Sequence, residues 1–266
     1  MGVAALLAAA TLAVTPASYV ASRQQADGGF AEAGSRPTPG LTAWAMLGLQ
    51  SAGLPTGKAY DYLVANEREL QSATDIELAL IAEAATGRVS DTLYARFTAL
   101  GRPDGRFGPA INSTAWGILA YAQVGRPFKL RVSYLLRHQR RSGGWGWIAG
   151  AAPDSNDTSA VIQALRTQGI RGLPIARGIT FLHRLQNADG GFELTAGRGS
   201  DAQSTAWAIQ AFIAARVKPP VRAFRYLAGL RRADGSYRYS RRYGATRVWV
   251  TSQVLPALAR KSFPLR

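Results

Sequence analysis

The sequence predicts an all-α fold, an α/α toroid of about six helix hairpins with inner and outer helix rings. Two observations lead to it. A short unit returns along the 266-residue chain, and its clearest copy has Phe181, Leu182, Gln186, Gly190 and Phe192 at fixed spacing. An apolar stretch that begins with Thr follows the copies of the unit, and a returning pair of elements is the signature of a repeat architecture. No strand-like alternation is sustained.

The first helix of each hairpin is expected to end at the unit's Gln and Gly turn. Glycine permits a positive φ angle, which makes it a common residue just after a helix. Other copies of the unit pair Gln24 with Phe30, Gln139 with Trp145 and, with Arg in the Gln position, Arg231 with Tyr237.

The second helix of each hairpin is expected to begin at Ser-Thr or Asp-Thr, which are good N-cap residues. These stretches are apolar nearly all round, as inner helices buried on most faces would be. Short links between antiparallel helices allow an open solenoid or a closed ring, and six such apolar helices favour the ring. The six starts are Thr42, Thr74, Thr114, Thr158, Thr205 and Thr251.

The expected organisation is one toroid domain over 18–266 behind a signal peptide over 1–17. The apolar run from Met1 to Ala17 has the length of a secretory signal and is short for a membrane span, so no transmembrane helix is expected in the mature chain. This predicts an extracytoplasmic protein; if the run is instead the first helix of the ring, the protein is cytoplasmic. The expected repeats lie near 18–59, 60–90, 91–129, 130–176, 177–221 and 222–266.

Composition excludes several classes of site. The chain has no cysteine, which rules out a disulfide framework, a thiolate zinc site, a thioester and a Cys nucleophile. The net charge of +16 is concentrated at one end, because 13 basic residues face one acid between Arg216 and Arg266. Such a one-signed region attracts polyanions. We therefore expect an anionic surface as a partner of the Arg222–Arg247 region, whereas no nucleic-acid recognition module is visible.

The unit at 181–192 resembles the QW motif of squalene and oxidosqualene cyclases. Together with the Ser-Thr-Ala-Trp segments, it makes the chain from Ser18 to Pro264 similar to the prenyltransferase/squalene-oxidase repeat superfamily. The resemblance implies that the Gln ties an outer helix to the start of a neighbouring inner helix while the aromatic residue stacks beneath. This structural role would fall to Gln24, Gln139, Gln186, Phe30 and Phe192.

The resemblance also indicates where catalysis would reside. Class II terpene cyclases have an Asp-x-Asp-Asp motif whose middle Asp protonates an alkene or epoxide, and the matching segment here runs from Asp154 to Asp157. The donor position holds Asn156, whose amide has no proton of usable acidity. Asp154 and Asp157 are the candidates if the protein is an enzyme. The structural alternative is that Asp154 and Asp201 cap helix N-termini. The cyclases are also usually two-domain proteins of more than twice this length.

Other enzyme classes find less support. Protein prenyltransferase β-subunits bind zinc through Asp, Cys and His, and here Cys is absent while His138 and His183 fall at unmatched surface positions. Neither a metal nor a cofactor is expected. Glycoside hydrolases on α/α rings use paired carboxylates, for which the candidates near loop ends are Asp154, Asp157, Glu193 and Asp201.

The sequence therefore favours a non-catalytic, exported repeat protein that binds a small apolar ligand or a partner protein at the mouth of the ring. A divergent terpene cyclase-like isomerase acting on an isoprenoid is the alternative, and a corrinoid-binding module of the transcobalamin type, which needs a second chain, is a further one. Trp44, Trp116 and Trp207 belong to the core or line a pocket. The candidates at the mouth are Asp154, Asn156, Asp157, Asp201, Trp145 and Trp147.

Overall fold

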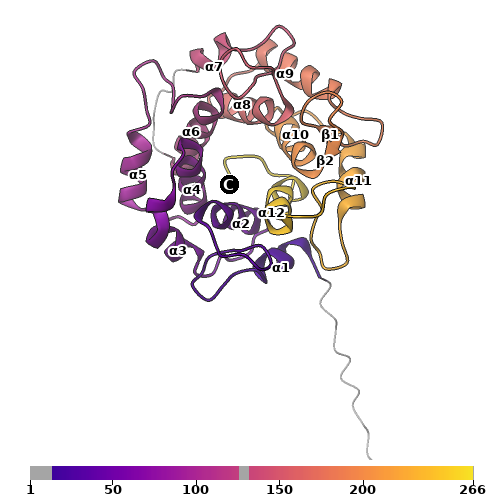
Figure 1. Cartoon of the computed structure of the whole chain (residues 1–266). Helices are drawn as coiled ribbons and strands as arrows, with labels where there is room; N and C mark the ends of the chain where they lie inside the picture. Colours follow the sequence, from indigo (N-terminus) through magenta and orange to yellow (C-terminus); the bar gives the residue numbers. More distant parts are fainter. Residues whose placement is uncertain (1–13, 126–131, 266) are drawn as a thin grey trace, which may run out of the picture.

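The computed structural model describes residues 14–125 and 132–265, which form a closed ring of helices (Figure 1). The inner helices are α2 (Pro39–Ser51), α4 (Ala73–Ala84), α6 (Ile111–Val124), α8 (Ser155–Thr167), α10 (Ala202–Ala214) and α12 (Arg247–Leu258). The outer helices are α1 (Pro16–Ala21), α3 (Ala59–Asn66), α5 (Asp91–Thr98), α7 (Ser133–Arg137), α9 (Leu173–Arg184) and α11 (Val221–Leu230). Short elements complete the described chain: η1 (Glu67–Glu69), β1 (Phe192–Glu193) and β2 (Ser200–Asp201).

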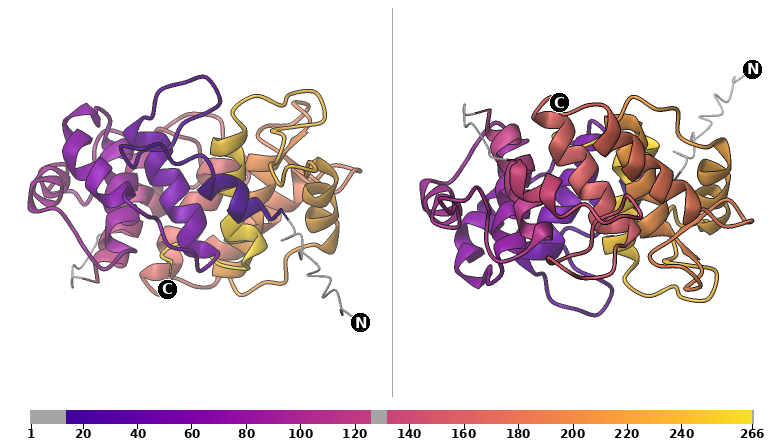
Figure 2. Two further views of the ribbon diagram at one scale, coloured as in Figure 1. Left: turned by 90° about the horizontal axis from the view of Figure 1, so that it is seen from below. Right: turned by 90° about the horizontal axis from the view of Figure 1, so that it is seen from above.

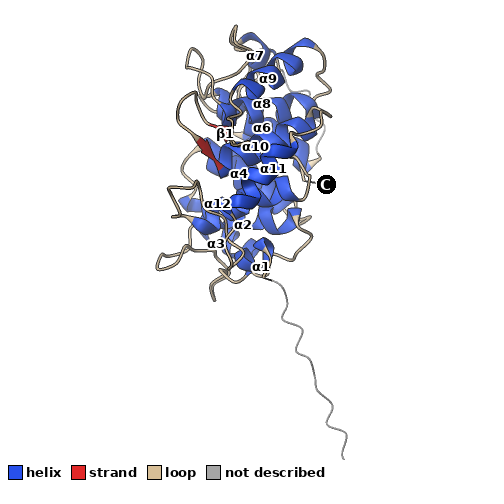
Figure 3. Cartoon of the chain, turned by 90° about the vertical axis from the view of Figure 1, so that its right-hand side faces the viewer, coloured by secondary structure: helices blue, strands red, loops and turns tan. Residues whose placement is uncertain are grey.

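Each inner helix packs on the next one along the chain, and α12 packs on α2 to close the circle. The side views show the helices of both rings within one short drum, with loops gathered at its two ends (Figures 2 and 3). The expected α/α toroid of six hairpins is thus confirmed for the described residues. The inner helices have neighbours on every side, which is why they are apolar almost all round.

Two glutamines of the repeat unit, Gln24 and Gln139, join successive outer helices, whereas Gln186 donates to Gly190 of its own turn at 2.9 Å. Gln24 donates through Nε2 to the main-chain oxygens of Gly28 and Thr56, both at 2.9 Å, and Thr56 lies just before α3. Gln139 repeats the pattern at 2.8 Å with Gly143 and with Pro174 in the first turn of α9. The resemblance had implied a tie to an inner helix. The structure corrects this, because the distant partner is the following outer helix.

The repeat threonines are not N-caps, which is a second correction. Apart from Thr74, each is the fourth or fifth residue of its helix, and its hydroxyl accepts the main-chain N–H of the aromatic residue in the preceding turn. Phe192 donates to Thr205 at 2.9 Å and Trp145 donates to Thr158 at 2.9 Å, for example. The caps lie earlier in the chain, as Asp201 does for α10. This bond fastens each turn onto the inner helix of its own hairpin.

The second hairpin departs from the pattern. Its inner helix α4 is capped by Ser72, so Ile76 occupies the place that threonine has in the other hairpins. Thr74 therefore lies two residues too early to be the equivalent residue. Because Ile76 has no hydroxyl and this hairpin lacks the Gly-aromatic turn, the usual fastening is absent from it.

The predicted signal peptide lies mostly outside the described residues. Within them, Thr15 caps α1 by accepting the N–H of Ser18 at 3.0 Å. The boundary expected after Ala17 would therefore divide the first helix of the ring. No helix in residues 14–125 and 132–265 is both long and apolar enough to cross a bilayer.

Candidate functional site

Polar side chains from three inner helices form a hydrogen-bonded chain at the mouth of the ring, where the inner helices begin. Thr74 of α4 donates through Oγ1 to Asn112 Oδ1 of α6 at 3.1 Å. Asn112 in turn donates through Nδ2 to Asp157 Oδ1 of α8 at 2.5 Å. Sequence reasoning missed Asn112. Its only signal was a polar residue two places before a repeat threonine.

The carboxyl of Asp157 favours its neutral form. Burial, together with the nearby charge of Asp154, raises the pKa of Asp157 to about 8, against a smaller lowering by the hydrogen bond from Asn112. Burial also raises the pKa of Asp154. Two carboxyl groups this close in a buried site resist ionising together. The pair therefore holds a proton at neutral pH.

Asp154 has a clear structural role. It is the N-cap of α8, and its Oδ1 accepts the N–H of Asp157 at 2.8 Å. Asp201 caps α10 in the same way, accepting the N–H of Ser204 at 2.7 Å and its hydroxyl at 2.8 Å. The expectation that these two aspartates cap helices is confirmed. Asn156 lies between Asp154 and Asp157 in the first turn of α8. It is half-buried, and its Oδ1 accepts the hydroxyl of Ser155 at 3.3 Å.

The two tryptophans expected at the mouth have different surroundings. Trp145 is fully buried and donates through Nε1 to the main-chain oxygen of Leu135 at 2.7 Å, so it packs inside its own hairpin. Trp147 is 58% exposed, and its main-chain oxygen accepts the N–H of Asn112 at 3.1 Å. Of the two, only Trp147 presents its ring to solvent beside the mouth.

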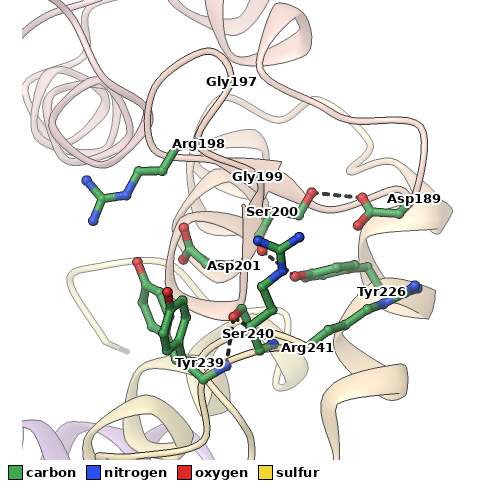
Figure 4. A pocket seen from close by; sticks show the side chains of 12 residues that line it. Asp189, Gly197, Arg198, Gly199, Ser200, Asp201, Tyr226, Tyr239, Ser240 and Arg241 are labelled. Atoms are coloured by element: carbon green, nitrogen blue, oxygen red, sulfur yellow. Dashed lines mark hydrogen bonds between the residues drawn. The ribbon is translucent and has the colours of Figure 1, made fainter.

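A cavity of about 690 Å³ opens beside Asp201 (Figure 4). Its walls come from the β1–β2 loop, the start of α10, α11 and the loop before α12. Figure 4 shows Tyr226 and Tyr239 on two sides of one hollow, with Asp201 beside Tyr239. The lining residues are Asp189, Gly197, Arg198, Gly199, Ser200, Asp201, Tyr226, Tyr239, Ser240, Arg241, Arg242 and Tyr243.

The walls of this cavity are braced by hydrogen bonds. Tyr226 donates through its hydroxyl to the main-chain oxygen of Ser200 at 2.6 Å, and Ser200 Oγ donates to Asp189 at 2.8 Å. Ala202 N–H donates to the main-chain oxygen of Tyr239 at 2.7 Å, which fixes the loop before α12 against α10. Burial raises the pKa of Asp201, whose side chain is nearly inaccessible to solvent.

The cavity carries positive charge. Arg198, Arg241 and Arg242 line it, and none of the three has a carboxylate partner within 4.0 Å among the described residues. The carboxyls present are Asp189 and Asp201, and Asp201 is buried and bonded to Ser204. Sequence reasoning identified Asp201 and the basic region but not the cavity. The signal was the run from Ser236 to Tyr243, in which Arg and Tyr alternate with Ser.

The other residues considered for catalysis or metal binding make structural contacts. Glu193 accepts the N–H of Gly199 at 2.8 Å and so closes the β1–β2 loop. His138 packs edge-on against Tyr134, and His183 against Phe212. Among the described residues, no group of three or more His, Cys, Asp or Glu side chains is arranged to bind a metal ion.

Aromatic side chains fill the middle of the ring. Trp44, Trp116 and Trp207 come from alternate inner helices, and their ring centroids lie 5.2–5.9 Å apart. Phe263, from the segment after α12, lies 5.6 Å from Trp116 and 6.5 Å from Trp44. Rings at these distances are in contact. The three tryptophans therefore belong to a central packed cluster.

Among known proteins, this chain matches solved structures but no family model and no curated sequence. Among solved structures, the type II terpene cyclase MstE from Scytonema has a TM-score of 0.69 at 15% identity, over 92% of this chain and 95% of its own. A glycosidase has a TM-score of 0.63 at 12% identity, over 92% of this chain and 94% of its own.

The chain has the α/α-toroid fold of the terpene cyclases. A third structure with this fold, ent-copalyl diphosphate synthase from Streptomyces platensis, has a TM-score of 0.59 at 19% identity, over 84% of this chain and 50% of its own. The expectation that a cyclase would be more than twice this length is corrected, because the match covers 95% of the MstE chain and 92% of this one. At these identities the likeness shows the fold, and one fold hosts unrelated functions.

Proposed function

We propose that the protein is a binding module whose ligand is a small anion carrying a ring, such as an acidic sugar or a sugar phosphate. The observation that carries the proposal is the braced cavity beside Asp201, in which three arginines lack carboxylate partners while three tyrosines line the walls. Guanidinium groups bind carboxylate, sulfate or phosphate through paired hydrogen bonds. Tyrosine rings offer flat faces against which a ring can pack.

This proposal refines the expected ligand at the mouth and the expected anionic partner. The binding site stays at the mouth end of the ring, but it moves from the centre to the side, between α10 and α11. The anionic partner becomes a small molecule that contacts Arg241 and Arg242. Arg231 and Arg247 are engaged elsewhere, with Val14 and with Asp234 respectively.

The test is isothermal titration of the full chain with glucuronate, glucose 6-phosphate, a sulfated disaccharide and neutral glucose. We expect one or more of the anions to bind and glucose not to bind. The double variant Arg241→Ala, Arg242→Ala should lose about tenfold or more in affinity, because a hydrogen bond to a charged group contributes roughly 1.5–3 kcal/mol. Arg68→Ala is the matched control, because Arg68 is exposed and is not among the residues that line the cavity. Binding by none of the anions would reject the proposal.

A second candidate is acid-catalysed cyclisation of an isoprenoid. It is favoured by Asp157, whose pKa of about 8 leaves a protonated carboxyl at the mouth. The terpene cyclases among the similar folds add support, and MstE has been solved with a geranylgeranyl substrate. It ranks second because the central aromatic cluster occupies the space where an isoprenoid would lie. Turnover of a polyprenyl substrate that Asp157→Asn abolishes would move this candidate to first place.

Two further proposals depend on residues or chains beyond those described. The first is export through a signal peptide within residues 1–17, most of which lie outside the described ranges. The corrinoid alternative needs a second protein chain. Each stays a prediction, to be checked by N-terminal sequencing of the secreted protein and by spectroscopy of the purified protein mixed with cobalamin.

A further inference from the structure

The end of the ring opposite the mouth is closed by the segment 260–265. After α12 the chain turns at Arg260, which has a φ of +53°, and runs back into the centre of the ring (Figure 1). Phe263 and Leu265 become buried there, with 3% and 7% of their surface exposed. Pro264, between them, remains half-buried.

Two glutamines hold the main chain of this segment. Gln123 of α6 accepts the N–H of Leu265 at 2.7 Å and donates to its main-chain oxygen at 3.0 Å. Gln163 of α8 accepts the N–H of Phe263 at 2.9 Å. The side-chain amide of Gln123 thus pairs with both main-chain groups of one residue. Such main-chain bonds hold a segment whatever its side chains are.

The side chains of the segment are recognised separately. Phe263 lies against Trp44 and Trp116 of the central cluster. Phe263 is thus held twice, through its main chain by Gln163 and through its ring by the two tryptophans.

The ring wall also contains buried polar atoms that have no hydrogen-bond partner among the described residues. Gln210 of α10 is five residues after its repeat threonine, as Gln163 is after Thr158, so the two occupy the same position on neighbouring helices. Gln210 is 1% exposed, and its Oε1 has no hydrogen-bond partner among the described residues. The Nε2 of Gln253, on α12, is likewise buried and unpartnered. Buried polar atoms normally find partners, so these two are free to receive an additional main-chain group.

From this geometry we propose that the end of the ring opposite the mouth is a binding site for an aromatic-Pro-aliphatic segment. Residues 263–265 of the same chain occupy it. The inference is independent of the anion cavity. Because the tethered segment has a high effective concentration, an added peptide binds only after the anchors of that segment are removed.

The experiment uses full-length protein and a fluorescent peptide with the sequence of residues 261–266. The wild-type chain should not bind it. The double variant Phe263→Ala, Leu265→Ala should bind one peptide per chain, with a change in tryptophan fluorescence because the peptide's Phe reaches Trp44 and Trp116. A peptide with Ala in place of that Phe should bind roughly tenfold more weakly or worse, given the aromatic surface it fails to bury.

A third substitution separates recognition from simple cavity filling. Adding Gln123→Ala to the double variant should weaken peptide binding about tenfold, because two main-chain hydrogen bonds are lost. Adding Gln25→Ala instead should leave peptide binding unchanged, because Gln25 is exposed in the turn between α1 and α2. A folded double variant that ignores the peptide, or that binds the Ala peptide equally well, overturns the proposal. So does a double variant that cannot fold, since the segment would then be part of the core.

Discussion

The guanidinium of Arg231 donates a hydrogen bond to the main-chain oxygen of Val14 at 2.7 Å, across the seam where the last hairpin meets the first. Gln24 makes the corresponding contact with Thr56, and Gln139 makes it with Pro174. Arg231 occupies the glutamine position of its own repeat unit. The last hairpin therefore uses an arginine for the contact that glutamine makes elsewhere, and this contact adds to the packing of α12 on α2 across the seam.

Arg231→Ala should weaken the seam. The loss of one hydrogen bond costs about 1 kcal/mol, which for a domain of this size lowers the melting temperature by roughly 2–4 °C. Thermal unfolding followed by circular dichroism measures it. Arg232→Ala is the matched control. Arg232 is the next residue and is also exposed and charged, but the hydrogen bond to Val14 comes from Arg231. Equal effects of the two substitutions would assign the loss to charge alone.

Much of the architecture could be predicted because the repeat is written in residue types with distinct backbone needs. Gly235 shows how. It has a φ of +84°, and a Cβ there would lie 2.6 Å from the main-chain oxygen of Thr15. Only glycine fits such a turn against the next outer helix. A glycine in such a turn thus indicates a hairpin end, and five of the six hairpins of the toroid have one.

The cavity could not be predicted in the same way. Its walls come from Arg198, Tyr226 and Arg241, which belong to three segments of two different hairpins. Nothing in their sequence spacing shows that they meet. The partner of each repeat glutamine was also misjudged, because a hydrogen bond to a main-chain oxygen leaves no trace in the identity of the partner residue. The repeat threonine was taken for a cap because Thr is common in both places.

Asp157→Asn should stabilise the protein at alkaline pH and have little effect at pH 4. The pKa of Asp157 is raised to about 8, so the folded protein holds a proton that the unfolded chain releases near pH 4. Stability from this group is therefore full below about pH 4 and is lost as the pH rises toward 8. Asparagine does not titrate, and the gain at pH 8.5 should be about 1 kcal/mol or more. Urea unfolding at both pH values measures it.

Asp234→Asn should show the opposite behaviour. Hydrogen bonding from the Ser236 side chain, more than its other neighbours, lowers the pKa of Asp234, which also pairs with Arg247 at 2.8 Å. Its stabilising effect is present above about pH 4 and is lost as the pH falls. The variant should therefore be the less stable protein at pH 8.5. If both variants shifted in the same direction there, the assignment of protons to Asp157 would be wrong.

Glu77→Leu should raise stability. Glu77 is completely buried in α4, and neither of its carboxyl oxygens has a hydrogen-bond partner among the described residues. Burial raises its pKa well above the usual value, so the folded protein keeps it neutral and loses stability as the pH rises. Replacing it by an apolar residue should add roughly 1–3 kcal/mol at pH 8 and less at pH 4. Glu69→Leu, at an exposed position, should change little.

Tyr226→Phe should weaken anion binding without changing the charge of the cavity. The hydroxyl of Tyr226 braces the wall through the main-chain oxygen of Ser200, and phenylalanine leaves that oxygen without its partner. A lost brace of this kind costs about 1 kcal/mol, or roughly fivefold in affinity if it is felt entirely in the bound state. The salt dependence distinguishes it from removal of Arg241 and Arg242. Because screening weakens exposed charge contacts, wild type and Tyr226→Phe should lose affinity in parallel as salt is added, whereas the double arginine variant should respond far less. A double arginine variant with the wild-type salt slope would place the anion somewhere other than this cavity.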